Sequence, residues 1–346
     1  MRVKIYGAGS IGNHLAQASR RMGWDVVVVD TDPKALERMK SDIYPKRYGA
    51  WDEKIELIEA GKESKGGFDI IVIGTPPDSH MKLALSSLEE KPRLLHIEKP
   101  LCAPDLKGVD EFMAEMKKCP EVVVTVGYDH AVSEGIEFVG ELVKGGKIGN
   151  VLTLDVEFRE HWRGIFAAHP WLAGPWETYL GFWKRGGGAG GEHSHALHLW
   201  QHLAEVVGFG KITDSHAMFS ERYDHGADYD ELAAFLLHTE SGKMGRAIQD
   251  VITYPVRKWV RLQGDKGFIE WHCNGVPEGD LVKYQAEGED LMEKVFPKKR
   301  PDDFYREVQH YDKLLQGEVK PEDSPLSFEK GLSVMKILQT AHHRND

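Results

Sequence analysis

Residues 1–30 restrict the fold more than any other part of this sequence. Two short apolar segments, at 3–5 and 26–29, enclose a Gly-Ala-Gly-Ser-Ile-Gly turn at 7–12 and a stretch with helical periodicity. This order of strand, glycine turn, helix and strand is typical of a βαβ unit whose helix N-terminus faces a pyrophosphate. Asp30 ends the second segment, where a carboxylate can bind ribose hydroxyls. We therefore predict a doubly wound parallel sheet that binds a dinucleotide.

The residues of the glycine turn have separate expected tasks. Gly7 makes the tight turn, Gly9 lets the backbone approach the pyrophosphate, and Gly12 lets the helix pack closely against the strand. Ser10 and Ile11 open the helix, where backbone N–H groups face the anion.

The end of the second apolar segment also predicts which dinucleotide binds. Asp30 would repel a 2′-phosphate, and the neighbouring Thr31 and Asp32 supply no arginine to receive one. We therefore expect NAD to be preferred over NADP, with Thr31 beside the adenosine ribose.

Length and composition narrow the class of protein. The chain has 346 residues. This is longer than a chain with a single hydrophobic core usually is, so two domains are expected. Its net charge of −11 argues against a nucleic-acid partner. The three widely spaced cysteines suggest a reducing compartment and no disulfide framework. We find no signal-peptide pattern and no apolar run long enough to span a bilayer, so we expect a cytoplasmic protein without a membrane partner.

Apolar runs and turn signals predict the remaining elements. In a first domain at 1–127 we expect strands at 68–73, 93–97 and 122–126, helices at 32–39, 52–60 and 104–117, and a short strand within 42–51. In a second domain at 128–346 we expect a helix at 132–143, strands at 151–158, 215–220, 232–239, 244–253, 258–262 and 267–271, and helix from Asp302 onward. Short turns between those strands indicate antiparallel pairing. The predicted class is α/β, with a parallel sheet followed by an α+β domain that has a large, mainly antiparallel open sheet.

Several motifs resemble one known family. Thr75-Pro76 follows one predicted strand, Glu98-Lys99-Pro100 follows the next, and a glycine run at 186–188 leads into Glu192-His193-Ser194-His195. With the glycine turn and Asp30, they resemble the Gfo/Idh/MocA family, the glucose-fructose oxidoreductase and inositol dehydrogenase group, over nearly the whole chain. The resemblance implies a Rossmann domain, NAD as cofactor, and a homodimer or homotetramer paired through the open face of the second sheet. It implies that the cofactor site is completed by Thr75, Pro76, His80, Glu98 and Lys99.

The resemblance also implies two catalytic residues. In the family, the lysine of Glu-Lys-Pro lies beside the nicotinamide and hydrogen-bonds the hydroxyl that is oxidised, which assigns that role to Lys99. A lysine at the mouth of a parallel sheet can stabilise a developing alkoxide. The shortened form of the family's histidine motif assigns the acid/base role to His195, and imidazole titrates near neutral pH. His198 replaces the usual aspartate, which leaves open how that position orients a substrate.

The segment at 161–183 holds four of the nine tryptophans and is predicted to be a long loop. Aromatic faces beside arginine and histidine suit a polyhydroxylated ligand, whereas the alternative is a packing or interface loop. His169-Pro170-Trp171 resembles a subgroup of the family associated with bacterial surface-sugar synthesis. The candidate substrate-binding residues are Lys99, Tyr128, Trp162, Arg163, Trp171, Glu192, His195 and His198.

Three histidines raise the alternative of a metal site. His195, His198 and His202 fall on one helical stripe, and imidazoles one turn apart can share a zinc ion. The family needs no metal, no cysteine lies nearby, and the chain has no His-Glu-x-x-His motif. We therefore expect no metal at these histidines.

These features together predict an NAD-dependent oxidoreductase. Its expected partner is a small carbohydrate-like molecule, namely a sugar, a sugar acid or a cyclic polyol. One alternative is a glycoside hydrolase that uses tightly held NAD as a recycled oxidant, since some relatives cleave glycosides that way. Another is a non-enzymatic NAD-sensing regulator, against which Lys99 and His195 argue.

Overall fold

The computed structural model describes residues 1–167 and 169–345, and it divides into two compact units. The first unit comprises residues 1–102, 106–129 and 300–329. The second comprises residues 103–105, 130–299 and 330 onward. No helix within the described residues is long and apolar enough to cross a membrane.

The first unit is built on a six-stranded sheet in the order β3-β2-β1-β4-β5-β6, with every neighbouring pair parallel. Its strands are β1 (Arg2–Tyr6), β2 (Asp25–Asp30), β3 (Ile55–Glu59), β4 (Ile70–Ile73), β5 (Leu94–Glu98) and β6 (Val123–Gly127). Valine and isoleucine make up most of β2 and all of β4, because these strands are buried on both faces. The predicted doubly wound parallel sheet is confirmed.

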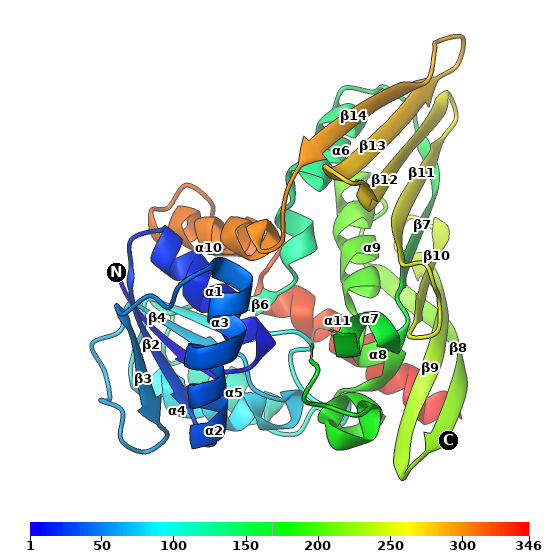
Figure 1. Ribbon diagram of the computed structural model, residues 1–346. Helices are drawn as coiled ribbons and strands as arrows, with labels where there is room; N and C mark the ends of the chain where they lie inside the picture. Colours follow the sequence, from blue (N-terminus) through cyan, green and yellow to red (C-terminus); the bar gives the residue numbers. More distant parts are fainter. Residues whose placement is uncertain (168, 346) are drawn as a thin grey trace. The chain divides into compact units, whose positions relative to one another are not determined.

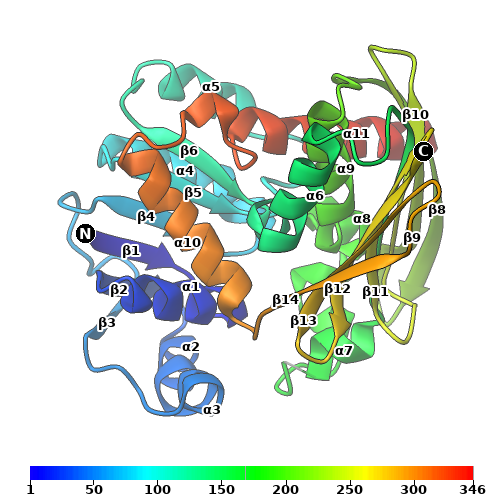
Figure 2. The same cartoon turned by 90° about the horizontal axis from the view of Figure 1, so that it is seen from above.

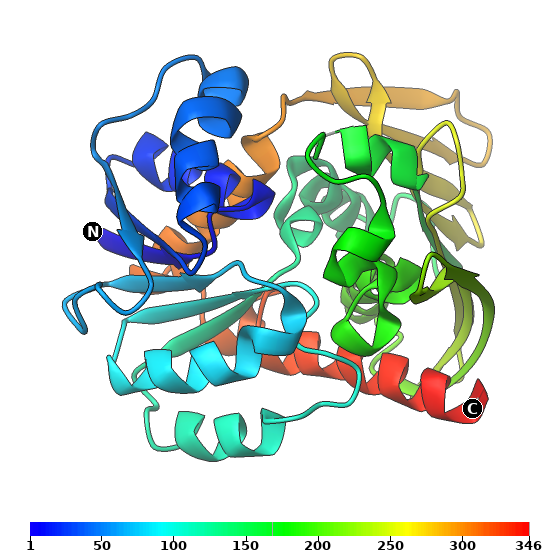
Figure 3. The same ribbon diagram turned by 60° about the horizontal axis from the view of Figure 1, so that its bottom comes forward.

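Helices cover both faces of this sheet. They are α1 (Ser10–Arg21), α2 (Pro33–Arg38), α3 (Tyr44–Tyr48), α4 (His80–Glu89), α5 (Val109–Met116) and α10 (Asp302–Leu315). In Figures 2 and 3, α4 and α5 lie on one face, whereas α1 and the orange α10 lie on the other. The apolar stripe of α1 is buried at Leu15, Ala16 and Ala18, and α10 buries Val308 and Tyr311. The chain therefore returns, after its second unit, to complete the first.

Two expectations for the first unit were wrong. Residues 52–60 were expected to be helical, but Ile55–Glu59 form the edge strand β3, which pairs with β2. Residues 42–51 were expected to contain a short strand, but they continue α2 through a π-helical turn (Met39–Ile43) into α3. Tyr44 stacks edge-on against Tyr48 and Trp51, with ring centroids 4.8 Å and 5.2 Å away, and this aromatic packing favours the helical path.

The second unit is built on an eight-stranded sheet in the order β14-β13-β12-β11-β7-β10-β9-β8. Its strands are β7 (Val151–Arg159), β8 (Ile212–Asp224), β9 (Ala227–Thr239), β10 (Met244–Asp250), β11 (Arg257–Gly264), β12 (Gly267–Val276), β13 (Gly279–Ala286) and β14 (Met292–Pro297). All pairs are antiparallel except β7 with β10. The predicted mainly antiparallel sheet is confirmed, and β13 and β14 are strands that the sequence analysis missed.

The helices of the second unit lie together on one face of this sheet (Figures 1 and 2). They are α6 (Glu134–Lys144), α7 (Trp162–Ala167), α8 (Gly188–Glu192), α9 (His195–Val206) and α11 (Phe328–Asn345), whose first two residues belong to the first unit. Trp200 of α9 is fully buried and donates a hydrogen bond from Nε1 to the Leu154 carbonyl at 2.8 Å. This contact fastens α9 to β7.

The segment at 161–183 is not the plain loop that was expected. It contains α7 and 3-10 turns at Pro175–Glu177 and Tyr179–Gly181, and a further 3-10 turn begins at Trp183. Proline and glycine interrupt these turns, so the sequence shows no helical periodicity that would have revealed them.

Candidate functional site

The glycine turn of the first unit has the form of an anion cradle. Gly7 has φ of +107°, and its N–H donates to the Val29 carbonyl at 2.8 Å, which holds the turn between β1 and β2. A Cβ atom on Gly12 would lie 1.9 Å from the Gly7 carbonyl oxygen. A Cβ atom on Gly9, the residue that precedes α1, would meet no atom within 4 Å. The space over the first turn of α1, where Ser10 and Ile11 lie, is therefore open to a phosphate group.

Asp30 lies at the end of β2, beside this turn. Its Oδ2 accepts a hydrogen bond from the Ala8 N–H at 2.7 Å, and its Oδ1 accepts one from the Asp32 N–H at 2.9 Å. A carboxylate can accept about four hydrogen bonds, so Asp30 keeps capacity for a ribose hydroxyl. Thr31 is exposed next to it. These residues fit a dinucleotide whose adenosine ribose carries no 2′-phosphate.

The turns that follow β4 and β5 are joined by one buried histidine. Nε2 of His80 lies 2.7 Å from the Thr75 carbonyl oxygen, and Nδ1 lies 3.1 Å from that of Pro100. Burial lowers the pKa of His80, so the imidazole is neutral near pH 7 and donates from one nitrogen. Thr75 is half-buried and Pro76 is exposed. His80 thus holds together two turns that both contain predicted cofactor-binding residues.

Glu98 and Lys99 follow at the carboxyl end of β5. Glu98 is buried, and its Oε2 accepts a hydrogen bond from the Lys99 N–H at 3.2 Å. Lys99 is half-buried. Ligands of open α/β sheets bind at the carboxyl ends of the strands, and the glycine turn after β1 lies at that same edge. Tyr128, which follows β6, is buried.

In the second unit, the single-turn helix α8 begins at Gly188, the last residue of the glycine run. Asp230 of β9 accepts a hydrogen bond from the Gly190 N–H at 2.5 Å. Nε2 of Gln249, on β10, donates to the carbonyl oxygens of Ala189 and Gly190, both at 3.2 Å. Neither Asp230 nor Gln249 was singled out from the sequence, because both act through long-range contacts with backbone. They position the segment that leads into Glu192, which is half-buried.

Two histidines at the start of α9 differ in their surroundings. His195 is the first residue of α9 and is half-buried, with its ring centroid 4.8 Å from His130 and 5.8 Å from Phe158. His198, one turn later, is buried. His130, which lies three residues beyond the end of β6, was not singled out from the sequence. The imidazole rings of His130 and His195 thus lie next to each other in the second unit.

His202 completes the helical stripe. Burial, with a smaller contribution from the charge of Lys330, lowers the pKa of His202 to about 4, so its imidazole is neutral. Within residues 1–167 and 169–345, no convergent group of potential metal ligands includes His198 or His202. The predicted stripe exists on α9, but its three histidines do not converge on one point.

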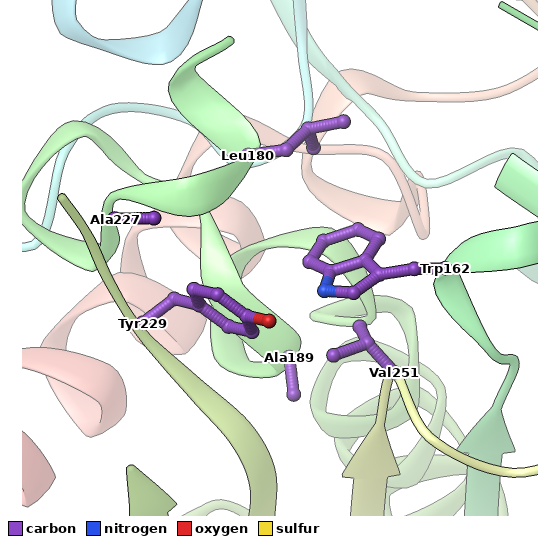
Figure 4. Close-up of a cluster of buried hydrophobic side chains, with 6 residues drawn as sticks. All are labelled: Trp162, Leu180, Ala189, Ala227, Tyr229 and Val251. Carbon is purple, nitrogen blue, oxygen red and sulfur yellow. The ribbon is translucent and has the colours of Figure 1, made fainter. Parts of the chain in front are cut away.

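The tryptophan-rich segment at 161–183 has a buried part and a more exposed part. Trp162 is 8% exposed and packs in a hydrophobic cluster with residues of β9 and the glycine run (Figure 4). That cluster consists of Trp162, Leu180, Ala189, Ala227, Tyr229 and Val251. Arg163 is exposed, and its guanidinium lies 4.4 Å from the centre of the Tyr254 ring. Trp171 is half-buried, with its ring centroid 5.3 Å from that of His169.

The protonation state of Asp230 predicts how the free energy of unfolding depends on pH. Burial raises the pKa of Asp230 to about 7, so the folded protein holds a proton that the unfolded chain loses at about pH 4. Stability from this group is therefore lost as pH rises from about 4 to about 7. We expect Asp230→Asn, which keeps a carbonyl acceptor for Gly190, to be more stable than the wild type by about 1–3 kcal/mol at about pH 8 and by less at about pH 5.

Urea unfolding at a series of pH values measures this difference. The exposed carboxylate Asp290 supplies the matched control, because Asp290→Asn should track the wild type at every pH. A constant difference between Asp230→Asn and the wild type across the range would contradict a raised pKa at this position.

Two family profiles match the chain. The profile described as "Oxidoreductase family, NAD-binding Rossmann fold" matches residues 1–128, and that of the "GFO/IDH/MocA C-terminal domain" matches residues 136–270. Among curated proteins, the Trk system potassium uptake protein TrkA of Streptomyces coelicolor is 36% identical over 75 residues, or 21% of this chain and 34% of TrkA. The chain thus spans about a third of the length of that curated relative.

Solved structures share the fold over nearly the whole chain. The WlbA dehydrogenase from Bordetella pertussis, in complex with NADH and UDP-GlcNAcA, is 18% identical, with a TM-score of 0.68 over 99% of this chain and 95% of that one. GenD2 from gentamicin A biosynthesis, in complex with NAD, is 18% identical, with a TM-score of 0.73 over 99% and 93%. An oxidoreductase from Agrobacterium radiobacter, in complex with NAD+, L-tartaric acid and magnesium, is 17% identical, with a TM-score of 0.74 over 99% and 95%.

Proposed function

Because the chain belongs to the Gfo/Idh/MocA family of NAD-binding oxidoreductases, we propose that it oxidises or reduces a ring carbon of a sugar, sugar acid or cyclic polyol. The observation that supports this most is in the first unit. Lys99 follows β5 at the carboxyl ends of the parallel strands, where the open cradle at Gly9 also lies. The buried carboxylate of Glu98 accepts a hydrogen bond from the Lys99 N–H. A cation is thereby placed at the edge where a dinucleotide-binding sheet receives its ligands.

The cofactor residues fall into two groups. Gly7, Gly9, Ser10, Ile11 and Gly12 shape the cradle for the pyrophosphate, and Asp30 with Thr31 receives the adenosine ribose. The turns after β4 and β5, which contain Thr75, Pro76, His80, Glu98 and Lys99, lie at the same edge of the sheet. NAD, when bound, supplies the hydride acceptor or donor. Two acidic residues at the ribose position, Asp30 and Asp32, disfavour the additional phosphate of NADP.

Lys99 and His195 carry the proposed chemistry. The ammonium group of Lys99 holds the reacting oxygen and stabilises negative charge that develops on it. His195 accepts the hydroxyl proton during oxidation and returns it during reduction, a task suited to an imidazole. His130, whose ring lies beside that of His195, is positioned to pass this proton onward.

The substrate class rests on residues of the second unit and on the relatives. Arg163 is exposed, Trp171 is half-buried, and His169 lies beside Trp171, so an arginine and two ring-bearing side chains are available to a hydroxylated ring. Glu192 and His198 are the further candidates for binding its hydroxyl groups. WlbA was solved with UDP-GlcNAcA, which makes nucleotide-linked sugar acids the first compounds to test on this chain.

A panel assay with the purified protein tests the proposal. NADH and NADPH are titrated by fluorescence, and NADH formation is then followed with nucleotide-linked sugars, free sugar acids and inositols. We expect tighter binding of NADH and turnover of at least one ring-bearing compound. Glycoside cleavage without net NADH formation would indicate a glycoside hydrolase that recycles its NAD. NADH binding with neither oxidation nor cleavage of any compound would favour an NAD-sensing regulator.

We also propose that the chain forms a homo-oligomer through the open face of its large sheet. Met218, Leu236 and Met244, on β8, β9 and β10, are 77%, 64% and 63% exposed. The strand register places them on one face, which carries no helix among the described residues. Light scattering should show a dimer or larger at micromolar concentration, and Leu236→Glu should dissociate it. A monomeric wild type would contradict this prediction.

A further inference from the structure

A cluster of three buried side chains lies beneath the Glu98-Lys99 turn, entirely within the first unit. His96 and Glu98 are on β5, and Glu307 is on α10. His96 and Glu307 are 0% exposed and Glu98 is 5% exposed. Neither the glycine cradle nor the acid/base chemistry uses His96 or Glu307. The cluster therefore needs an explanation of its own.

The potential ligand atoms of these side chains converge on one point. His96 Nε2 lies 3.5 Å from Glu98 Oε1 and 3.9 Å from Glu307 Oε1, and all three atoms lie within 4.8 Å of one another. None of the three makes a hydrogen bond to any residue that the structure describes. The Tyr311 hydroxyl, one turn along α10, interacts with the Glu307 carboxyl group but forms no hydrogen bond of normal geometry among the described residues. Buried polar atoms without partners each cost about 1–3 kcal/mol, so their convergence points to a bound ligand.

The charges of the cluster favour a cation. Glu98 and Glu307 are two buried carboxyl groups, and Asp129 adds a third carboxyl group nearby. Within the described residues, Glu98 and Glu307 each form an ion pair with His96. Two carboxyl groups thus share one buried space around a single imidazole, and a divalent ion bound to all three would balance the negative charge.

We propose that His96, Glu98 and Glu307 bind a divalent transition-metal ion. One imidazole and two carboxylates form a donor set that suits zinc or manganese. A tetrahedral ion with bonds of about 2.1 Å holds its ligand atoms about 3.4 Å apart, close to the observed 3.5 Å and 3.9 Å. Both carboxyl groups coordinate in their ionised form.

Neighbouring groups orient the ligands as they do around metals in proteins. His96 Nδ1 lies 3.0 Å from Thr125 Oγ1, so an Nδ1–H donated to this hydroxyl leaves the Nε2 lone pair directed at the cluster. Glu98 binds with Oε1, while its Oε2 accepts the Lys99 N–H. The ion would therefore join α10 to β5 and fix the backbone of Lys99, which gives it a structural and positioning role.

Metal content of the intact, tag-free protein tests the proposal. Because the site is buried, the ion enters as the chain folds, so cells are grown with added zinc or manganese. We expect about one equivalent of zinc or manganese by mass spectrometry, and anomalous scattering from crystals should place the ion within bonding distance, about 2.2 Å, of His96 Nε2. A wild type that holds no stoichiometric metal, or an ion located elsewhere, would overturn the proposal in favour of a buried water or shared proton.

Two variants and a matched control assign the ligands. Glu307→Gln and His96→Gln keep the side-chain size but remove a donor, and each should lower metal affinity at least about 100-fold. Glu318→Gln changes an exposed carboxylate beyond the end of α10 and should keep full metal content. A chelator should lower the Tm of the wild type and of Glu318→Gln but not that of the ligand variants. Full metal content in a folded Glu307→Gln or His96→Gln would contradict the assignment, and the wild-type measurement decides alone if either variant fails to fold.

Discussion

Replacing His195 with alanine is expected to lower kcat by about 10²–10⁴-fold while the Kd for NADH stays nearly unchanged. General acid-base assistance acts only while the proton moves, so its loss affects turnover far more than cofactor binding. Lys99→Ala should lose at least as much, because the ammonium group contacts an oxygen whose charge develops in the transition state. Lys99→Met, which keeps the length of the side chain, separates loss of charge from loss of packing. Steady-state kinetics with the substrate found in the panel, and NADH titration, measure both effects.

His198→Ala provides the internal contrast for this prediction. His198 is buried one turn along α9 from His195, so as a substrate-positioning residue it should mainly raise KM. Full activity in His195→Ala together with an inactive His198→Ala would show that the proton carrier lies one helical turn later. Equal activity of Lys99→Ala and the wild type would remove Lys99 from the proposed chemistry.

Two alanine substitutions in the glycine turn should both weaken NADH binding but should differ in their effect on stability. Gly12→Ala places a Cβ atom 1.9 Å from the Gly7 carbonyl oxygen, so the backbone of the turn must move. Alanine is more favourable than glycine inside a helix by about 1 kcal/mol. The steric clash should outweigh this gain, so we expect the free energy of unfolding to fall by about 1–3 kcal/mol. NADH binding should be lost with it, because the displaced turn is the proposed pyrophosphate site.

Gly9→Ala is the matched variant. Gly9 has φ of −75°, which alanine adopts, and its Cβ atom would meet nothing within 4 Å. Stability should therefore change by no more than about 1 kcal/mol, the range expected at the residue before a helix. The methyl group would occupy the space proposed for the pyrophosphate, so the Kd for NADH should rise at least about tenfold, or about 1.4 kcal/mol. Thermal unfolding and fluorescence titration measure the pair, and unchanged affinity in Gly9→Ala would move the pyrophosphate away from α1.

The structure bore out those sequence predictions that depend on local pattern. The strand, glycine turn, helix and strand at 1–30 form as expected because each element follows from the residues within it. The strand at 70–73 is a continuous apolar run, so the sequence alone predicts that it lies inside a parallel sheet. The roles of Lys99 and His195 came from motif resemblance and stay predictions.

What the tertiary structure decided depends on residues far apart in the chain. Ile55–Glu59 is a strand because it pairs with β2, and no pattern inside five residues distinguishes that strand from a helix turn. Trp162 packs in a cluster because β9 and β10 approach it from positions 227–251. His96 and Glu307 stand 211 positions apart, and only the return of α10 to the first unit brings their side chains together. Sequence periodicity reports which face of an element is buried, whereas the neighbour that buries it is set by packing across the whole chain.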